Sequence, residues 1–244
     1  MKKAGHDAYG ELLLWQLKTG EAAAEIVERE DGFIDTGSIA GMYFSPPNKW
    51  PKIELKAIDM TKGRVLDVGC GAGRHSLYLQ EKGLDVTAID SSPGAIKVTK
   101  KRGVKRAILR PIAEISKFRA GSFDSVIMMG NNFGLFGNFK NARKLLWEFE
   151  RITTPDAIIV AVTRDPYKTT RREHLDYQKF NRERGRMSGQ IRFRIRFSKA
   201  TGPWFDYLLV SPEEMNEILE TTPWQVGKLL HESDSQYIAI VEKR

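Results

Sequence analysis

The chain has 244 residues, of which 41% are hydrophobic and 29% are charged, as expected for a globular protein with one substantial core. No apolar run approaches the roughly 20 residues needed to cross a bilayer, and the first residues are polar. We therefore expect a cytoplasmic protein with no secretory signal and no membrane contact. The one cysteine, Cys70, excludes an intramolecular disulfide framework and a cysteine-cluster zinc site, and no bound metal is expected.

The net charge of +8 is confined to one segment of the chain. Residues 164–199 hold twelve basic and four acidic side chains, so the remainder is neutral on balance. Such a segment suits contact with RNA phosphates or with an anionic substrate. We favour a second interpretation, in which alternating arginines cover the exposed face of a strand and block pairing at its edge. These arginines are Arg192, Arg194 and Arg196.

Residues 1–63 precede the regular pattern of the chain, and we expect them to form a helical cap or lid. Residues 9–17 and 21–29 have the composition of helices. Residues 31–50 contain glycines, prolines and aromatic residues without a clear period, which indicates an ordered cap.

Between residues 64 and 163, short β-rich runs alternate with longer helical ones, which predicts a parallel sheet flanked by helices. The expected strands are 64–68, 85–89, 106–110, 123–129 and 157–163. The expected helices are 74–82, 94–101 and 141–152, and residues 111–122 are expected to form an irregular link. This region begins the main domain, which we place at residues 64–244.

Residues 164–210 are interpreted as an insertion into the main domain. Strand 190–197 alternates apolar and basic residues, and residues 204–210 form its expected antiparallel partner after a Gly-Pro turn. We expect Trp204 and Phe205 to lie in the core of this hairpin. Ser211 and Pro212 begin a helix, and two strands at 225–230 and 236–242 close the chain as a hairpin.

The strongest local signal is a glycine-rich turn after the first expected strand of the sheet. Gly69, Gly71 and Gly73 occupy alternate positions. Glycines let the backbone approach a ligand closely, and the following helix directs its N-terminal N–H groups at that ligand. A dinucleotide-binding turn has its third glycine where this chain has Arg74. The spacing therefore favours a nucleoside without phosphates.

A carboxylate ends the next expected strand, 21 residues after Gly69. An ionised carboxylate has two accepting oxygens, so Asp90 at this place can hold both hydroxyls of a ribose and repel a 2′-phosphate. The turn and the acid together predict a nucleoside-binding site.

These features resemble the class I S-adenosylmethionine-dependent methyltransferases. The matching segments are 67–73, 89–90, 121–124 and 129–134, and segments 50–51, 130–137, 185–192 and 202–215 are similar to a bacterial and archaeal subgroup. The resemblance implies a doubly wound, Rossmann-like α/β fold with a seven-stranded, mostly parallel sheet and an antiparallel C-terminal strand, here with the inserted antiparallel hairpin. It also implies S-adenosylmethionine as the cofactor.

The resemblance assigns the methionine and ribose parts of the cofactor to residues around the turn. Asp67 orients the turn and the methionine amino group, and Asp90 holds the ribose hydroxyls. Gly130 and Asn131 offer backbone or amide groups near the transferred methyl. The turn residues that pass under the cofactor are Gly69, Cys70, Gly71 and Gly73.

The resemblance assigns the adenine to two further segments. Ser91 and Ser92 lie beside the base. Members of the family often place an acid after the third strand to bind the adenine amino group, where this chain has Ile112, Ala113 and Glu114. We favour recognition by the Ala113 backbone with Ile112 packed on the ring, with Glu114 as the alternative.

No general-base motif is evident in the chain. Asn131 and Asn132 can hold an amine or hydroxyl by hydrogen bonds, and His174, Tyr177 and Tyr43 are candidates for proton handling or for substrate walls. The residues at the fourth strand end resemble small-molecule N-methyltransferases, which favours an amine or a carboxylate-bearing metabolite as acceptor. We expect a monomer or homodimer.

Two rival functions remain open on the sequence. The first is methylation of RNA with segment 164–199 as a phosphate track. The second is a non-catalytic protein that binds S-adenosylmethionine or a partner. Aminopropyl transfer is disfavoured because nothing resembles the paired acids of that chemistry.

Overall fold

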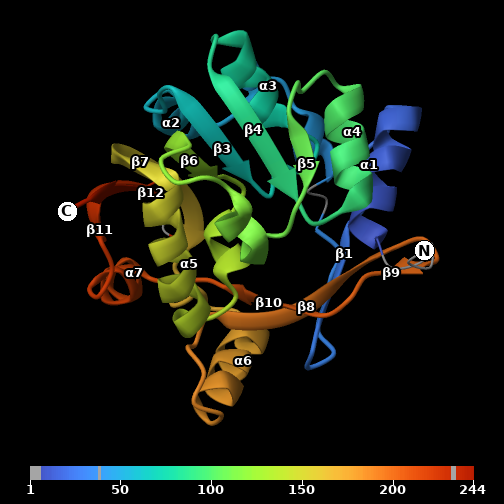
Figure 1. Ribbon diagram of the computed structural model, residues 1–244. Coiled ribbons are helices and arrows are strands. Elements are labelled where there is room, and N and C mark those ends of the chain that lie inside the picture. The colour runs from blue at the N-terminus through green and yellow to red at the C-terminus, as the bar shows by residue number, and fades with distance from the viewer. Residues whose placement is uncertain (1–6, 38–39, 232–234) are drawn as a thin grey trace.

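The computed structural model describes residues 7–37, 40–231 and 235–244. Within them the chain forms a seven-stranded sheet and a separate five-stranded sheet (Figure 1). The larger sheet has the order β11-β12-β7-β6-β3-β4-β5, and β12 runs antiparallel to its neighbours. Its strands are β3 (Arg64–Val68), β4 (Asp85–Asp90), β5 (Ala107–Leu109), β6 (Phe123–Met128), β7 (Thr153–Arg164), β11 (Trp224–His231) and β12 (Gln236–Lys243). The predicted doubly wound fold is confirmed.

Helices cover both faces of the larger sheet because its central strands bury alternate residues on opposite sides. Val126 and Met128 of β6 pack in the core beneath α5 and α7, whereas Ile127 packs in the core beneath α2 and α3. The helices are α1 (Ala8–Thr19), α2 (Lys52–Ile58), α3 (Arg74–Glu81), α4 (Pro93–Lys101), α5 (Phe139–Ile152), α6 (Arg172–Arg182) and α7 (Pro212–Leu219). The 3₁₀ turns are η1 (Ala40–Phe44), η2 (Pro47–Lys49), η3 (Ile112–Lys117) and η4 (Asn132–Phe136). No helix in this described part of the chain is long and apolar enough to span a membrane.

The smaller sheet has the order β10-β8-β1-β2, with β9 paired to β8. Its strands are β1 (Ile26–Arg29), β2 (Ile34–Asp35), β8 (Gln190–Phe197), β9 (Ala200–Thr201) and β10 (Phe205–Leu208). The antiparallel pairing of β8 and β10 confirms the predicted inserted hairpin. In Figure 1 this sheet lies beyond the arrowheads of β3 and β4, and α6 lies on its far side.

The helix predicted at residues 21–29 is wrong, because residues 21–25 are irregular and the rest is a strand. Residues 26–29 form β1, in which Val27 lies opposite Ile195 of β8. Ile26 and Val27 are β-branched and suit a strand, and β8 supplies backbone partners from a distant part of the chain. Residues close to the N-terminus thus complete the sheet of the insertion.

We predicted that the arginines of β8 protect a sheet edge. This prediction is wrong, because β8 lies between β10 and β1. Their side chains instead pair with carboxylates on those two neighbouring strands. Arg194 lies 2.8 Å from Glu28, and the remaining pairs are Arg196 with Glu28 at 3.3 Å and Arg192 with Asp206 at 3.3 Å. Cross-strand charge pairing explains the alternation better than exposure does.

Helix α1 packs against α4 through two glycines. A methyl group on Gly94 would collide with the backbone of Gly10, so the two helices approach closely. At its other end, α1 places Trp15 beside Phe197 of β8, with ring centroids 6.0 Å apart. Helix α1 therefore connects α4, which packs on the larger sheet, with the smaller sheet.

Candidate functional site

The glycine turn folds sharply at the carboxyl end of β3. Gly69 and Cys70 donate backbone hydrogen bonds to the carbonyl of Ile89, which ties the turn to β4. Gly71 has a φ of +56°, and a Cβ there would lie 2.6 Å from the Tyr9 hydroxyl. Glycine is required at this position both by the backbone angle and by the close approach of Tyr9.

Asp90 lies against this turn, as the sequence predicts. One carboxylate oxygen accepts from the Gly71 N–H at 3.0 Å and the other accepts from the Ser92 N–H at 2.8 Å. Burial raises the pKa of Asp90 to about 6, although these backbone hydrogen bonds act in the opposite direction. Each oxygen keeps a further lone pair, so the carboxylate can accept two more hydrogen bonds from a ligand.

Asp67 is buried beneath the turn and faces the start of α3. Its Oδ2 accepts from the Ser76 hydroxyl at 2.6 Å. Burial raises the pKa of Asp67 to about 7, and the charge of Asp90 contributes in the same direction. Two acidic groups therefore stand at the turn and favour a ligand that carries positive charge.

Two asparagines follow β6 and have different surroundings. The side-chain amide of Asn132 donates to the carbonyls of Val68 and Gly69 at 2.9 and 2.8 Å, so Asn132 fixes the turn. Asn131 adopts a left-handed conformation with a φ of +68°, directly after Gly130. Its Oδ1 is buried without a hydrogen-bond partner, which is a feature that a bound donor would satisfy.

The smaller sheet is attached to this loop by Tyr207 of β10. The Tyr207 hydroxyl donates to the Asn131 carbonyl at 2.6 Å. Its ring lies so close to Gly134 of η4 that no side chain fits there. This contact extends an aromatic face from Tyr207 to Phe205 and Phe193. The insertion thus forms a wall beside the loop that follows β6.

Two tyrosines from the first 63 residues also reach the turn, and one of them binds Glu25. Tyr9 of α1 and Tyr43 of η1 have ring centroids 5.4 Å apart, and the Tyr43 hydroxyl donates to Glu25 Oε2 at 3.1 Å. Burial raises the pKa values of both tyrosines and of Glu25. Tyr43 was a sequence candidate, whereas Tyr9 and Glu25 were missed, because neither belongs to a motif.

Several of the residues assigned to the cofactor have side chains directed elsewhere. Cys70 packs with Ala88 and Ile96, so that only its backbone is available to the turn. Glu114 pairs with Lys117 at 2.6 Å and Ala113 is exposed, so the choice between these residues for the adenine stays a prediction. Ser91 is exposed. The Ser92 hydroxyl caps α4 by accepting from Ala95.

His174 and Tyr177 of α6 are not brought to the turn by any contact in the structure. The Tyr177 hydroxyl donates to Glu30 at 3.0 Å and accepts from the Arg192 N–H at 3.1 Å. His174 packs edge-on against Phe33. These partners attach α6 to the smaller sheet, so a catalytic role for either residue stays a prediction without structural support.

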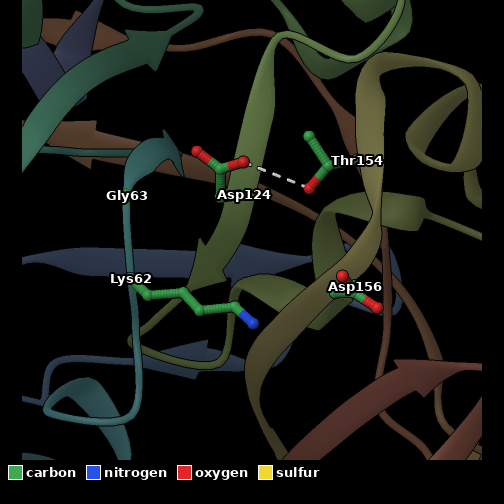
Figure 2. A pocket seen from close by; sticks show the side chains of 5 residues that line it. All are labelled: Lys62, Gly63, Asp124, Thr154 and Asp156. Atoms are coloured by element: carbon green, nitrogen blue, oxygen red, sulfur yellow. Dashed lines mark hydrogen bonds between the residues drawn. The ribbon is translucent and has the colours of Figure 1, made fainter.

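A hollow at the opposite end of the larger sheet has a different character (Figure 2). It is lined by residues before β3 and at the start of β6 and β7, which are Lys62, Gly63, Asp124, Thr154 and Asp156. Asp124 accepts from the Thr154 hydroxyl at 3.1 Å and from the Arg64 side chain at 3.0 Å. These bonds, above all those from Arg64, hold the pKa of Asp124 at about 2. Asp124, the acid of the 121–124 segment, therefore links β6 to β3 and β7, and it lies away from the glycine turn.

The strand order, the glycine turn and the acid that ends β4 are together those of the class I S-adenosylmethionine-dependent methyltransferases, whose fold this chain has. The site fits that cofactor, because Asp90 retains free lone pairs and Asn131 Oδ1 lacks a partner. Residues 66–161 match the family described as "Methyltransferase domain".

Known proteins agree with this assignment. A SAM-dependent methyltransferase from Bacteroides fragilis, solved with S-adenosyl-L-homocysteine, superposes with a TM-score of 0.82 at 25% identity over 99% of this chain and 96% of that one. The demethylmenaquinone methyltransferase of Renibacterium salmoninarum is 34% identical over 52% of this chain and 54% of its own. The glycine/sarcosine N-methyltransferase of Halorhodospira halochloris is 32% identical over 58% and 53%. The chain thus spans about half the length of these curated relatives.

Proposed function

We propose that this protein transfers a methyl group from S-adenosylmethionine to a nitrogen atom of a small-molecule acceptor. The observation that carries the proposal is the position of Asp90, whose carboxylate is fixed by Gly71 and Ser92 and still has lone pairs for two ribose hydroxyls. Residues 1–63 and the insertion 164–210 would act together as the cover of this site.

Each part of the site has a distinct task in this proposal. The glycine turn would lie under the cofactor, Ile112 and Ala113 would contact adenine, and Asn131 would contact the methionine end. When bound there, S-adenosylmethionine supplies a methyl group on a positively charged sulfur, which is an electrophile without further activation. The protein then has to align the acceptor and exclude water, and alignment can contribute about 7–11 kcal/mol to lowering the barrier.

Support for a small acceptor comes from the cover and from the relatives. Tyr9 and Tyr43 lie against the turn and Tyr207 lies against the loop after β6, and such an aromatic cover suits a small molecule better than a folded RNA. The relatives are a glycine/sarcosine N-methyltransferase and a demethylmenaquinone methyltransferase. Nitrogen is favoured by the glycine/sarcosine N-methyltransferase among these relatives.

The direct test is formation of S-adenosylhomocysteine from S-adenosylmethionine in the presence of small primary and secondary amines, matched alcohols and transfer RNA. We expect turnover with at least one amine and none with RNA. Turnover with RNA alone would replace the small molecule by RNA as acceptor. Tight cofactor binding without any turnover would favour a non-catalytic binding protein.

A further inference from the structure

Glu25 is a buried carboxylate without a cation. Its side chain is 5% exposed, and its one hydrogen-bond partner among the described residues is the Tyr43 hydroxyl. Burial raises the pKa of this carboxyl, whereas the Tyr43 hydrogen bond acts to lower it. A buried carboxylate costs free energy unless it is paired, so the absence of a lysine, arginine or histidine partner calls for an explanation.

The strand pairing directs Glu25 toward the cofactor side of the smaller sheet. Val27 lies opposite Ile195, whose side of β8 carries Phe193 and Phe197, and Glu25 shares that side because it precedes Val27 by two residues. The paired carboxylate Glu28 lies on the other side with Arg194. The two acids of this segment therefore have opposite surroundings.

Tyr43 links Glu25 to the glycine turn. The Tyr43 hydroxyl donates to Glu25, and its ring lies edge-on to Tyr9 and 3.8 Å from the Cβ position of Gly71. Glu25 is therefore one hydrogen bond away from an aromatic side chain that contacts the turn.

We propose that the Glu25 carboxylate binds the amino group of a cationic acceptor, so that the substrate is a small primary or secondary amine. This inference rests on the proposed methyl transfer and names its substrate class. An ammonium group supplies the positive charge that Glu25 lacks and several N–H donors for the two carboxylate oxygens. The tyrosine rings suit the same cation, because aromatic faces attract ammonium groups.

Binding alone does not make an ammonium group a nucleophile. One N–H bond must break, its electron pair must stay on nitrogen, and the proton must move to an acceptor. A Glu25 carboxylate oxygen is the group placed to take that proton. Glu25 would thus contact the substrate both as its counter-ion and as the acceptor of its proton.

The test compares Glu25→Gln with wild type in the amine turnover assay, using the amine that wild type methylates best. Glutamine keeps an oxygen for Tyr43 but removes the charge. We expect kcat/KM for the amine to fall by roughly tenfold to a hundredfold, with S-adenosylhomocysteine affinity unchanged within twofold. Glu25→Asp keeps the charge and should recover part of the loss. Glu21→Gln is the matched control, because Glu21 is an exposed acid of the same segment.

The possible outcomes separate this inference from the proposed function. Equal kcat/KM in Glu25→Gln and wild type would overturn the role of Glu25. The role of Glu25 would also be overturned if the wild-type protein bound S-adenosylhomocysteine but methylated only alcohols and no amine, or methylated no acceptor at all. Failure of wild type to bind S-adenosylhomocysteine would instead refute the proposed function itself. Thermal unfolding of each variant establishes that a loss of turnover does not come from unfolding.

Discussion

Asp7 joins the first helix of the chain to the helix that follows Asp90. Its Oδ2 accepts a hydrogen bond from the Gly94 N–H at 2.8 Å, and its Oδ1 accepts from the Gly10 N–H at 3.0 Å. One carboxylate thus caps α1 and also satisfies a free N–H group in the first turn of α4. This pair fixes the position of α1, and with it Tyr9 above the glycine turn.

Replacing Asp7 by alanine should therefore weaken both the fold and the cover of the site. Loss of a helix cap costs about 1–2 kcal/mol, and each kcal/mol lowers the melting temperature of a chain this long by about 2–4 °C. Differential scanning calorimetry measures this shift. Asp7→Asn retains one accepting oxygen and should lose less. A melting temperature equal to wild type in Asp7→Ala would contradict the bridging role.

Gly71→Ala should disrupt the turn for two reasons. The residue has a φ of +56°, and the new methyl group would meet the Tyr9 hydroxyl. Gly83→Ala is a matched control, because Gly83 has a φ of +86° but nothing within 4 Å of its Cβ position. We expect both variants to lose about 1–2 kcal/mol of stability from backbone strain, but only Gly71→Ala to bind S-adenosylhomocysteine more weakly, by at least about tenfold. Equal affinities in the two variants would argue against close approach of the cofactor at Gly71.

Asn132→Ala should destabilise the protein through the turn rather than through a missing substrate contact. The variant leaves the carbonyls of Val68 and Gly69 without their side-chain donor, at a cost of about 1–3 kcal/mol. Chemical denaturation measures this loss. Asn141→Ala, at an exposed position of α5, should change stability little. If Asn132→Ala were as stable as Asn141→Ala, the link between β6 and the turn would be unimportant.

Cofactor affinity should depend on pH through Asp90, whose pKa lies at about 6. The ionised carboxylate accepts both ribose hydroxyls, so S-adenosylhomocysteine should bind more tightly as pH rises from 5 to 7.5. Asp90→Asn should flatten the part of this dependence centred near pH 6. Equal wild-type affinity at the two pH values would contradict a ribose contact to Asp90.

The stability of the free protein should show the opposite dependence. The raised pKa values of Asp67 and Asp90 mean that the folded state binds more protons than the unfolded state between about pH 4 and pH 7. These two groups therefore lower the free energy of unfolding as pH rises through that range. Bound cofactor should offset the share that belongs to Asp90.

The sequence predicted the larger sheet and the turn well because their signals are local. Glycines at alternate positions, a strand before them and an acid at the end of the next strand lie within one βαβ unit. The helix start at Ser211 is likewise local, with its hydroxyl bonded to the Glu214 N–H and the Glu214 side chain bonded back.

The smaller sheet was only half predicted because its pairing is non-local. Ile26 and Val27 become a strand only beside residues about 170 positions later, and no pattern within residues 21–29 distinguishes that outcome from a helix. The roles of Tyr9 and Glu25 depend on the same long-range packing. The acid that orders the beginning of α3 is a further example, since Glu54 pairs with both Arg74 and His75 across 20 residues or more.

The most direct test of the account is calorimetric binding of S-adenosylhomocysteine to wild type, Asp90→Ala and Asp85→Ala. Asp85 lies at the exposed opposite end of the same strand and serves as the control. Loss of two charge-assisted hydrogen bonds should cost Asp90→Ala about 2–4 kcal/mol, which weakens binding by roughly 30-fold to 1,000-fold, while Asp85→Ala binds as wild type does. An Asp90→Ala protein that remains folded and binds within twofold of wild type would contradict the assignment of the site.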